Sequence, residues 1–190
     1  MAQARVLKPS ELRRVLDYTA TRPHGPRNRA ILLLTHWGGM RIGEVAALRL
    51  ADVLGQDGGI KQEIRLEAAR TKARRPRTVY LNVRLRRELA AYSETLQSNL
   101  PRDRPLFTTQ KRTGFSANTL CQAINVIYRR AGMEGATSHS GRRSLITALA
   151  QKGVGVRVLA EIAGHRDIRV TQAYIDVNEA MTRAAIEMAA

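Results

Sequence analysis

Apolar residues recur at three- and four-residue spacing along most of this chain, and only its middle departs from that pattern. Such spacing is typical of helices that bury one face. The segments with this spacing, or with a helix start signal, are residues 8–16, the run that ends at Leu34, 41–48, 82–96, 117–131, 140–151, 156–163, 168–174 and 178–189. Glycines that stop helices follow several of them, including Gly38, Gly153 and Gly164. Most of the chain is therefore predicted to be helical.

The middle of the chain has the pattern of short strands. Alternating or β-branched residues occur around positions 52–54, 64–66 and 78–81, separated by turns rich in glycine or arginine. We therefore predict a mixed fold, mainly α with a small antiparallel β-sheet. The 190 residues have the length of one domain, and no repeat, low-complexity tract or linker divides residues 1–190.

The charge of the chain indicates the class of partner. Lys and Arg number 32 against 16 Asp and Glu, which gives a formal charge of +16, while 44% of residues are hydrophobic. A chain this apolar can bury a core, so its charge is not that of a disordered basic tail. A strong positive potential favours polyanions, above all nucleic acid. Aromatic residues are only 4%, so few side chains could stack on the bases of a single strand. We therefore expect the chain to bind the phosphate backbone of a duplex.

Several other classes are excluded by simple features. No apolar run approaches the length that spans a bilayer, and no signal-type apolar core follows the N-terminus. We expect a soluble, cytoplasmic protein without membrane partners. Cys121 is the only cysteine, which excludes an internal disulfide and any zinc site that needs two thiolates. Neither a metal nor another cofactor is expected.

The densest basic stretch lies in the predicted hairpin, between Arg65 and Arg87. Its positive residues are Arg65, Arg70, Lys72, Arg74, Arg75, Arg77, Arg84, Arg86 and Arg87. One interpretation is that these residues only form the solvated rim of the hairpin. The net charge favours phosphate contact instead, because a basic hairpin gains free energy by releasing counterions from a duplex. We expect Arg70, Arg74, Arg75 and Arg77 to bind DNA.

Arginine, histidine and tyrosine recur in three further motifs. They are Arg41 with Glu44, His139 with Arg142, and His165 with Tyr174. Taken singly, each has a structural explanation. Arg41 could pair with Glu44 across one helical turn, and His165 could cap a helix C-terminus. Tyr174 could be a core ring with an exposed hydroxyl.

Taken together, the motifs predict a site for phosphoryl transfer without a metal. Attack on a phosphodiester builds negative charge on the non-bridging oxygens, which Arg41, Arg142 and His165 could stabilise. A tyrosine hydroxyl has an ordinary pKa of about 10, so as a nucleophile it needs a cationic field or a nearby base. Tyr174 would have both, with His139 as the candidate base.

In their order and spacing these motifs resemble those of the tyrosine recombinase family, the phage-integrase type of site-specific recombinases. The motifs are Gly39-Met40-Arg41-Ile42-Gly43-Glu44-Val45, Thr71-Lys72, Thr137-Ser138-His139-Ser140-Gly141-Arg142, and Ala163-Gly164-His165 with Thr171 and Tyr174. The resemblance covers almost the whole chain. All six positions that the family uses in catalysis hold the family's residue types: Arg41, Lys72, His139, Arg142, His165 and Tyr174.

The resemblance implies a DNA strand transferase that works at specific sites on double-stranded DNA. Tyr174 would attack the scissile phosphate to give a 3′-phosphotyrosyl link, and Lys72 would protonate the leaving 5′-oxygen. His139 would act as acid or base, Arg41, Arg142 and His165 would stabilise the transition state, and Glu44 would support the site. It also implies a homotetramer on DNA, accessory DNA-bending proteins, and a nucleoid-associated enzyme of bacterial, phage or plasmid origin, encoded by a mobile element.

The chain departs from the family pattern at a few positions. Gly141 stands where the family usually has leucine, Arg143 follows Arg142, and Arg166 and Asp167 replace small hydroxyl residues. We expect these changes to alter helix packing and local charge more than chemistry. The family's usual N-terminal DNA-binding domain is expected to be absent, which leaves open a short natural recombinase or an excised catalytic domain.

Three alternative functions stay open at this point. A type IB topoisomerase shares the chemistry and would relax arbitrary supercoiled DNA. A DNA-binding regulator or accessory factor could keep the fold without turnover. A basic helical domain could instead bind acidic protein surfaces, and its affinity for DNA would then be lost in moderate salt.

Overall fold

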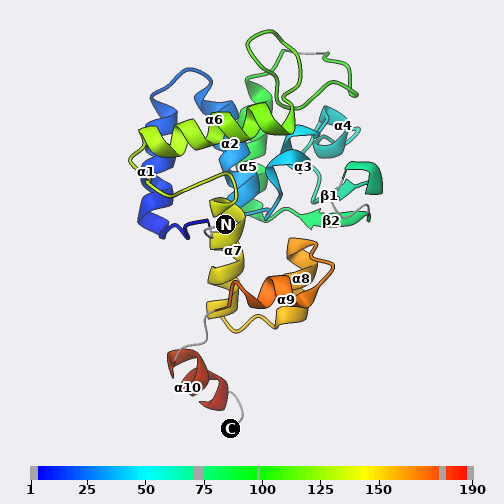
Figure 1. Cartoon of the computed structure of the whole chain (residues 1–190). Coiled ribbons are helices and arrows are strands. Elements are labelled where there is room, and N and C mark those ends of the chain that lie inside the picture. The colour runs from blue at the N-terminus through cyan, green and yellow to red at the C-terminus, as the bar shows by residue number, and fades with distance from the viewer. Residues whose placement is uncertain (1–3, 71–74, 98, 176–178, 188–190) are drawn as a thin grey trace.

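The computed structural model describes residues 4–70, 75–97, 99–175 and 179–187. Within these ranges the elements are α1 (Pro9–Ala20), α2 (Gly25–His36), α3 (Ile42–Ala46), α4 (Leu50–Val53), β1 (Glu63–Leu66), the 3₁₀ turn η1 (Ala68–Arg70), β2 (Arg77–Tyr80), α5 (Val83–Glu94), α6 (Ala117–Arg130), α7 (Ser140–Gln151), α8 (Val156–Ala163), α9 (Ile168–Gln172) and α10 (Glu179–Glu187) (Figure 1). The prediction of a mainly helical fold with a small antiparallel sheet is confirmed. None of these described helices has the length and apolar character needed to cross a membrane.

Helices α1 to α6 and the sheet share one large apolar core and form the main body, with α2 at its centre. Residues 30–34 of α2 form a continuous buried run, because α1, α5 and α7 all pack against this helix. Pro26 fits its first turn, where no backbone N–H is required. The helix ends one residue before Trp37, so that Gly38 and Gly39 can turn the chain toward α3. A predominantly apolar helix is thereby surrounded, as its sequence indicated.

The sheet consists of two antiparallel strands among the described residues, with Glu63 opposite Tyr80 and Leu66 opposite Arg77. Its inner face carries Ile64, Leu66 and Val79, which are all buried. The strand predicted at residues 52–54 is wrong, because this segment belongs mostly to α4. The Asp52 carboxylate accepts a hydrogen bond of 2.7 Å from the backbone N–H of Arg49 and so stabilises a helix start.

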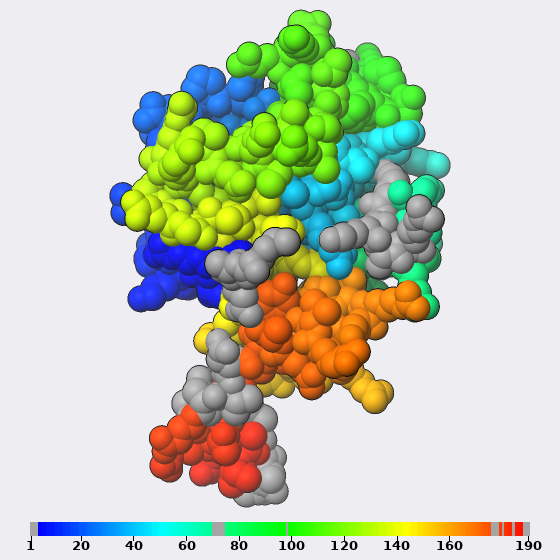
Figure 2. Space-filling view, viewed as in Figure 1, coloured from blue at the N-terminus to red at the C-terminus, as the bar shows by residue number. Residues whose placement is uncertain are grey.

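A second, smaller apolar cluster lies beyond the main body. Its buried members are Ile146 and Ala150 of α7 and Leu159 and Ala163 of α8. Helix α7 connects the two regions, since it packs against α2 in the main body and also against α8. Figure 2 shows α8 and α9, in orange, directly below the main body, and α10, in red, beyond them. The observed bounds of α7 and α8 equal the predicted ones.

Candidate active site

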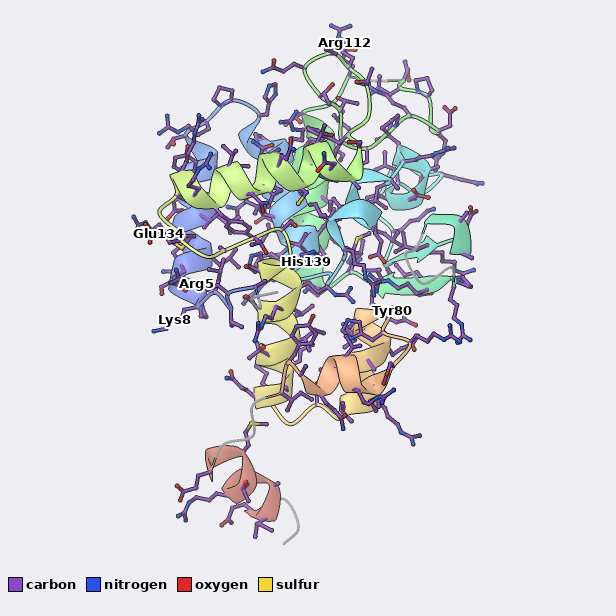
Figure 3. The ribbon with its side chains drawn as sticks, in the orientation of Figure 1. Arg5, Lys8, Tyr80, Arg112, Glu134 and His139 are labelled. Carbon is purple, nitrogen blue, oxygen red and sulfur yellow. The ribbon has the colours of Figure 1, made fainter. Side chains whose placement is uncertain are left out.

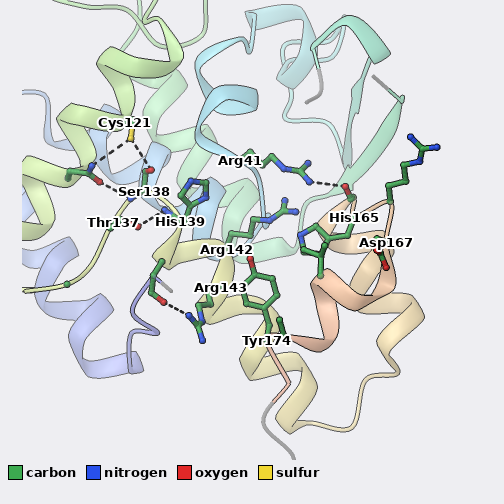
Figure 4. Close-up of a pocket in the computed structure, with 17 residues that line it drawn as sticks. Arg41, Cys121, Thr137, Ser138, His139, Arg142, Arg143, His165, Asp167 and Tyr174 are labelled. Atoms are coloured by element: carbon green, nitrogen blue, oxygen red, sulfur yellow. Dashed lines mark hydrogen bonds between the residues drawn. The ribbon is translucent and has the colours of Figure 1, made fainter. Parts of the chain in front are cut away.

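The predicted catalytic motifs meet in one pocket of about 1050 Å³ between the main body and the smaller cluster. The predicted catalytic residues that line it are Arg41, His139, Arg142, His165 and Tyr174 (Figure 4). Segments separated by more than one hundred residues therefore contribute to a single cavity. Across the described part of the chain, no group of three or more His, Cys, Asp or Glu side chains could hold a metal ion.

Arg41 reaches the pocket from the start of α3 and is held by Glu44. Its Nη1 donates to Oε1 of Glu44 at 3.0 Å, and its backbone N–H donates to Oε2 at 2.8 Å. Its Nη2 donates to the carbonyl of Gly164 at 2.9 Å. Burial raises the pKa of Glu44, but hydrogen bonds and charges from Arg77 and Arg41 outweigh it and leave the pKa below its usual value. The carboxylate therefore stays charged and fixes the guanidinium.

Arg142 lies in the first turn of α7 and is almost completely buried. Its Nη1 donates to the carbonyl of Gly39 at 2.8 Å, and its Nη2 donates to the carbonyl of Ala163. Burial, and then the nearby cations of Arg41 and Arg77, lower its pKa to about 9. The guanidinium is still charged at neutral pH, in surroundings where its charge is poorly screened.

His165 directly follows the left-handed residue Gly164 (φ 54°), which ends α8. Its Nδ1 lies 2.9 Å from Oγ1 of the buried Thr171. Burial, followed by the charges of the neighbouring arginines, lowers the pKa of His165 to about 4, so the ring is neutral at neutral pH. When the Thr171 hydroxyl donates to Nδ1, the ring proton resides on Nε2 and can be donated to a ligand.

Tyr174 follows α9 and is half-buried. Its ring stacks on His165 with centroids 5.8 Å apart, and the guanidinium of Arg143 lies 5.5 Å from its ring centroid. Its backbone carbonyl accepts a hydrogen bond of 3.3 Å from Thr147. Figure 4 shows the Tyr174 hydroxyl directed toward Arg142. A nucleophile at this position would face the cationic field that the sequence predicted.

His139 lies at the N-terminal end of α7 (Figure 3), on the wall of the same pocket, and is exposed. Its backbone N–H donates to Oγ1 of Thr137 at 3.3 Å. Lys72 and Arg74 lie outside the described residues, and of Arg70 only the backbone is described, in η1. The predicted roles of these three side chains stay predictions.

The two remaining predicted DNA contacts differ in placement. Arg75 is exposed. The Arg77 side chain is only 6% exposed and donates to Glu44 and to the carbonyl of Ile162, so it does not lie on the surface as expected. The alternation of side chains along β2 could have indicated this burial, because Arg77 lies on the same strand face as the buried Val79.

Gly141, one of the departures from the family pattern, has a packing explanation. A Cβ at this position would lie 2.3 Å from Oγ1 of Thr35 and 2.8 Å from Cδ2 of His36. The hydrogen bond of 3.0 Å between His36 and Tyr128 fixes that ring within the core. Helices α2 and α7 can therefore approach this closely only because residue 141 has no side chain.

Comparison with protein families gives a match over residues 5–181 to the model described as "Phage integrase family". The chain is 27% identical to tyrosine recombinase XerC of Lactobacillus delbrueckii subsp. bulgaricus over 162 residues, which are 83% of this chain and 52% of that protein. It is 28% identical to transposase A from transposon Tn554 of Staphylococcus aureus over 181 residues, with 89% and 47% covered. The chain thus spans about half the length of the curated relatives it matches.

Solved structures show the same fold. A crystal structure of XerA recombinase superposes with a TM-score of 0.77 at 23% identity, covering 98% of this chain and 66% of the other. The Tn1549 transposon integrase in complex with transposon right end DNA gives 0.77 at 16% identity, with 99% and 67% covered. The catalytic domain of bacteriophage HP1 integrase gives 0.66 at 19% identity, with 97% and 95% covered.

Proposed function

Because the chain belongs to the phage integrase family, we propose that it cleaves and rejoins DNA strands at specific sites through a 3′-phosphotyrosyl intermediate. One observation carries the proposal: the hydroxyl of Tyr174 shares a pocket with Arg41, Arg142 and His165. Two guanidinium groups and a neutral imidazole donor thus line the pocket in which a phosphate would lie beside this hydroxyl. Such donors stabilise charge that develops on non-bridging oxygens.

The proposed chemistry balances without a cofactor. The Tyr174 oxygen forms a bond to phosphorus while the bond to the 5′-oxygen of the next nucleotide breaks. The phenolic proton passes to a base, for which His139 is the candidate, and the leaving oxygen takes a proton, for which Lys72 is the candidate. Attack by a 5′-hydroxyl from another strand reverses these steps, so the phosphodiester energy is kept in the tyrosyl link.

Positions around the pocket complete the proposal. Glu44 supports Arg41, while Arg70, Arg74 and Arg75 on the hairpin would contact phosphates of double-stranded DNA. We further propose that the chain acts as one catalytic domain, as a homotetramer on DNA with accessory DNA-bending proteins, in the cytoplasm of a bacterial host. The relatives named above are recombinases, integrases and a transposase, which favours strand exchange over topoisomerase-like relaxation or a non-catalytic regulator.

A trapping experiment on DNA of random sequence tests the chemistry and finds the target together. The wild-type chain is incubated with a pool of nicked suicide duplexes of random central sequence, from which the 5′-hydroxyl fragment is lost after cleavage. Denaturing electrophoresis then detects covalent protein–DNA adducts, and sequencing of the trapped DNA gives the site. Tyr174→Phe should form no adduct and still bind the selected DNA.

A second tyrosine provides the matched control. Tyr80 lies on β2 (Figure 3) and is 73% exposed, outside the pocket that contains Tyr174. Tyr80→Phe removes the same hydroxyl and should form the adduct as the wild type does. Absence of an adduct with the wild type, or its persistence in Tyr174→Phe, would contradict the proposed function.

A further inference from the structure

Three consecutive carbonyls at the C-terminal end of α8 accept hydrogen bonds from three arginines of the described chain. Ile162 accepts from Nη1 of Arg77 at 2.9 Å. Ala163 accepts from Arg142, and Gly164 accepts from Arg41 at 2.9 Å. Carbonyls at a helix C-terminus lack partners within the helix and carry the negative end of its dipole, so cations are favoured there. His165 is the next residue, and its position depends on this end of α8.

Arg77 differs from the other two arginines in the groups that accept its hydrogen bonds and in its position relative to the pocket. Arg41 and Arg142 line the pocket that contains Tyr174, and Arg77 does not. With a side chain only 6% exposed, Arg77 directs Nε and Nη2 to the two oxygens of Glu44, at 3.3 and 2.6 Å, and Nη1 to Ile162. Its guanidinium is therefore committed to the protein and not directed to a substrate in the pocket.

Glu44 accepts hydrogen bonds from two arginines, which together occupy all the acceptor sites of its carboxylate. Each carboxylate oxygen accepts one hydrogen bond from Arg41 and one from Arg77, which matches the roughly four lone-pair sites of a carboxylate. The carboxylate is 2% exposed, so water cannot readily replace a lost donor. Removal of Arg77 would leave half of these sites unfilled and would let Glu44 and Arg41 move together.

The stem of Arg77 also packs against the turn that precedes His165. A Cβ on Gly164 would lie 2.6 Å from Cδ of Arg77. Gly164 also has a positive φ of 54°, so two independent features require glycine here. Arg77 thus contacts the end of α8 through its guanidinium at Ile162 and through its aliphatic stem at Gly164.

We propose that Arg77 is a positioning residue, which holds Glu44 and the C-terminal turn of α8 together so that Arg41 and His165 face the same phosphate. The inference rests on the proposed function. Arg77 acts on the reaction through two other residues and contacts neither the DNA nor the nucleophile. A displacement of about 1 Å at a catalytic group can cost on the order of 10²-fold in rate.

The test separates the rate of cleavage from the affinity for DNA. Single-turnover cleavage is measured at saturating concentrations of the trapped suicide duplex, and the dissociation constant is measured by titration. Arg77→Gln should lower the cleavage rate on the order of 10²-fold and leave the dissociation constant within a few-fold of the wild type. Arg77→Lys should give an intermediate rate, because one ammonium cannot bridge both Glu44 and the carbonyl of Ile162. Arg13→Gln, which removes an exposed arginine from α1, should keep both values.

Weaker DNA binding with an unchanged saturated rate in Arg77→Gln would overturn the proposal, since that result describes a phosphate contact. A wild-type chain without any adduct would instead overturn the proposed function.

The positioning role is then tested by hydrogen exchange at the amides of Gly164 and His165, and by NMR titration of the His165 ring. In Arg77→Lys, which keeps the charge and serves also if Arg77→Gln does not fold, exchange should be faster than in the wild type. Unchanged exchange would overturn the inference.

Discussion

The main body and the smaller C-terminal cluster are held together in different ways. The main body has a large apolar core, built from α1 to α6 and the sheet, around the buried run of α2. Within the described residues, the smaller cluster has four buried apolar members, two of them alanines. Its larger members, Ile146 and Leu159, each contribute about 1.5–3 kcal/mol by burial. Five partly buried residues pack against these four, namely Leu149, Val154, Ile162, Tyr174 and Ile175. Apolar packing therefore contributes less here than in the main body.

Hydrogen bonds at the boundary also hold this cluster to the main body. Arg41, Arg77 and Arg142 all donate to carbonyls at the end of α8. Two of these arginines also line the proposed catalytic pocket. The same side chains thus join the two regions, and Arg41 and Arg142 would provide positive charge for the proposed chemistry. A change in one of them should therefore affect both the stability of the fold and the rate of the reaction.

The largest effect is expected from Arg142→Ala. The transition state loses a guanidinium, which should lower single-turnover cleavage about 10²–10³-fold. The carbonyls of Gly39 and Ala163 lose their donor, which should lower the free energy of unfolding by about 2 kcal/mol. Arg102→Ala is the control, because Arg102 also donates to two carbonyls, at 2.7 and 2.9 Å, but from an exposed position in the main body. Equal unfolding of both variants in urea would contradict a joining role for Arg142.

Gly141→Leu, which restores the family's usual residue, should break the contact between α2 and α7. The added side chain would collide with Thr35 and His36, and overpacking of this kind costs about 3 kcal/mol. Urea unfolding measures the loss. Gly155→Ala is the control, because no atom lies within 4 Å of a Cβ there. Thr35→Ala should restore part of the stability in the double variant, and strictly additive losses would argue against the collision.

The stability of the fold should depend on pH through two histidines, the deeply buried His36 of the main body and His165 in the pocket. Burial lowers the pKa of His36 from 6.5 to about 4. Between these values the unfolded chain binds the proton and the folded chain does not, so the free energy of unfolding falls as the pH falls, by up to about 1.4 kcal/mol per pH unit. His36→Gln should reduce this slope between about pH 6.5 and pH 4.

Burial and the neighbouring arginines lower the pKa of His165 to about 4 as well, so His165→Gln should flatten the slope over the same pH range. His24→Asn replaces an exposed histidine at a positive φ of 61°, which asparagine tolerates, and serves as the control. Urea unfolding across this pH range gives the slopes. An unchanged slope in His36→Gln would show that other groups cause the acid sensitivity.

The smallest effect is expected from Asn82→Ala, which removes a cap inside the main body. The Asn82 side chain accepts from the backbone N–H of Leu85 at 2.9 Å at the start of α5. Its loss should lower the free energy of unfolding by about 1 kcal/mol, measured by thermal unfolding, and leave adduct formation unchanged. Asn82→Asp keeps an acceptor and should retain most of the stability. A loss of cleavage in Asn82→Ala would show that this cap also affects the pocket.

The sequence predicted helices well where glycine ends them, as at Gly153 and Gly164 beside α7 and α8. The strand prediction failed at α4. There the Asp52 carboxylate accepts a hydrogen bond from the backbone N–H of Arg49 and stabilises the start of a helix, although the sequence pattern is typical of a strand. Five of the residues that line the pocket were predicted as a set, because their residue types carry their chemistry: Arg41, His139, Arg142, His165 and Tyr174. The hydrogen bonds of Arg41 and Arg142 to Gly39, Ala163 and Gly164, and of Arg77 to Ile162, were not predicted. A backbone carbonyl has no signature in the sequence.

The concentration of positive charge at the end of α8 links the stability of the fold to its ligand. Among the described residues, three guanidinium groups lie near the carboxylate of Glu44, and their mutual repulsion contributes to the low pKa of Arg142. An oxyanion bound in the pocket beside Arg41 and Arg142 would reduce that repulsion only in the folded chain. Each tenfold excess of anion over its dissociation constant then adds about 1.4 kcal/mol to the free energy of unfolding. If the proposed function is correct, the DNA backbone should thus protect the folded chain against unfolding.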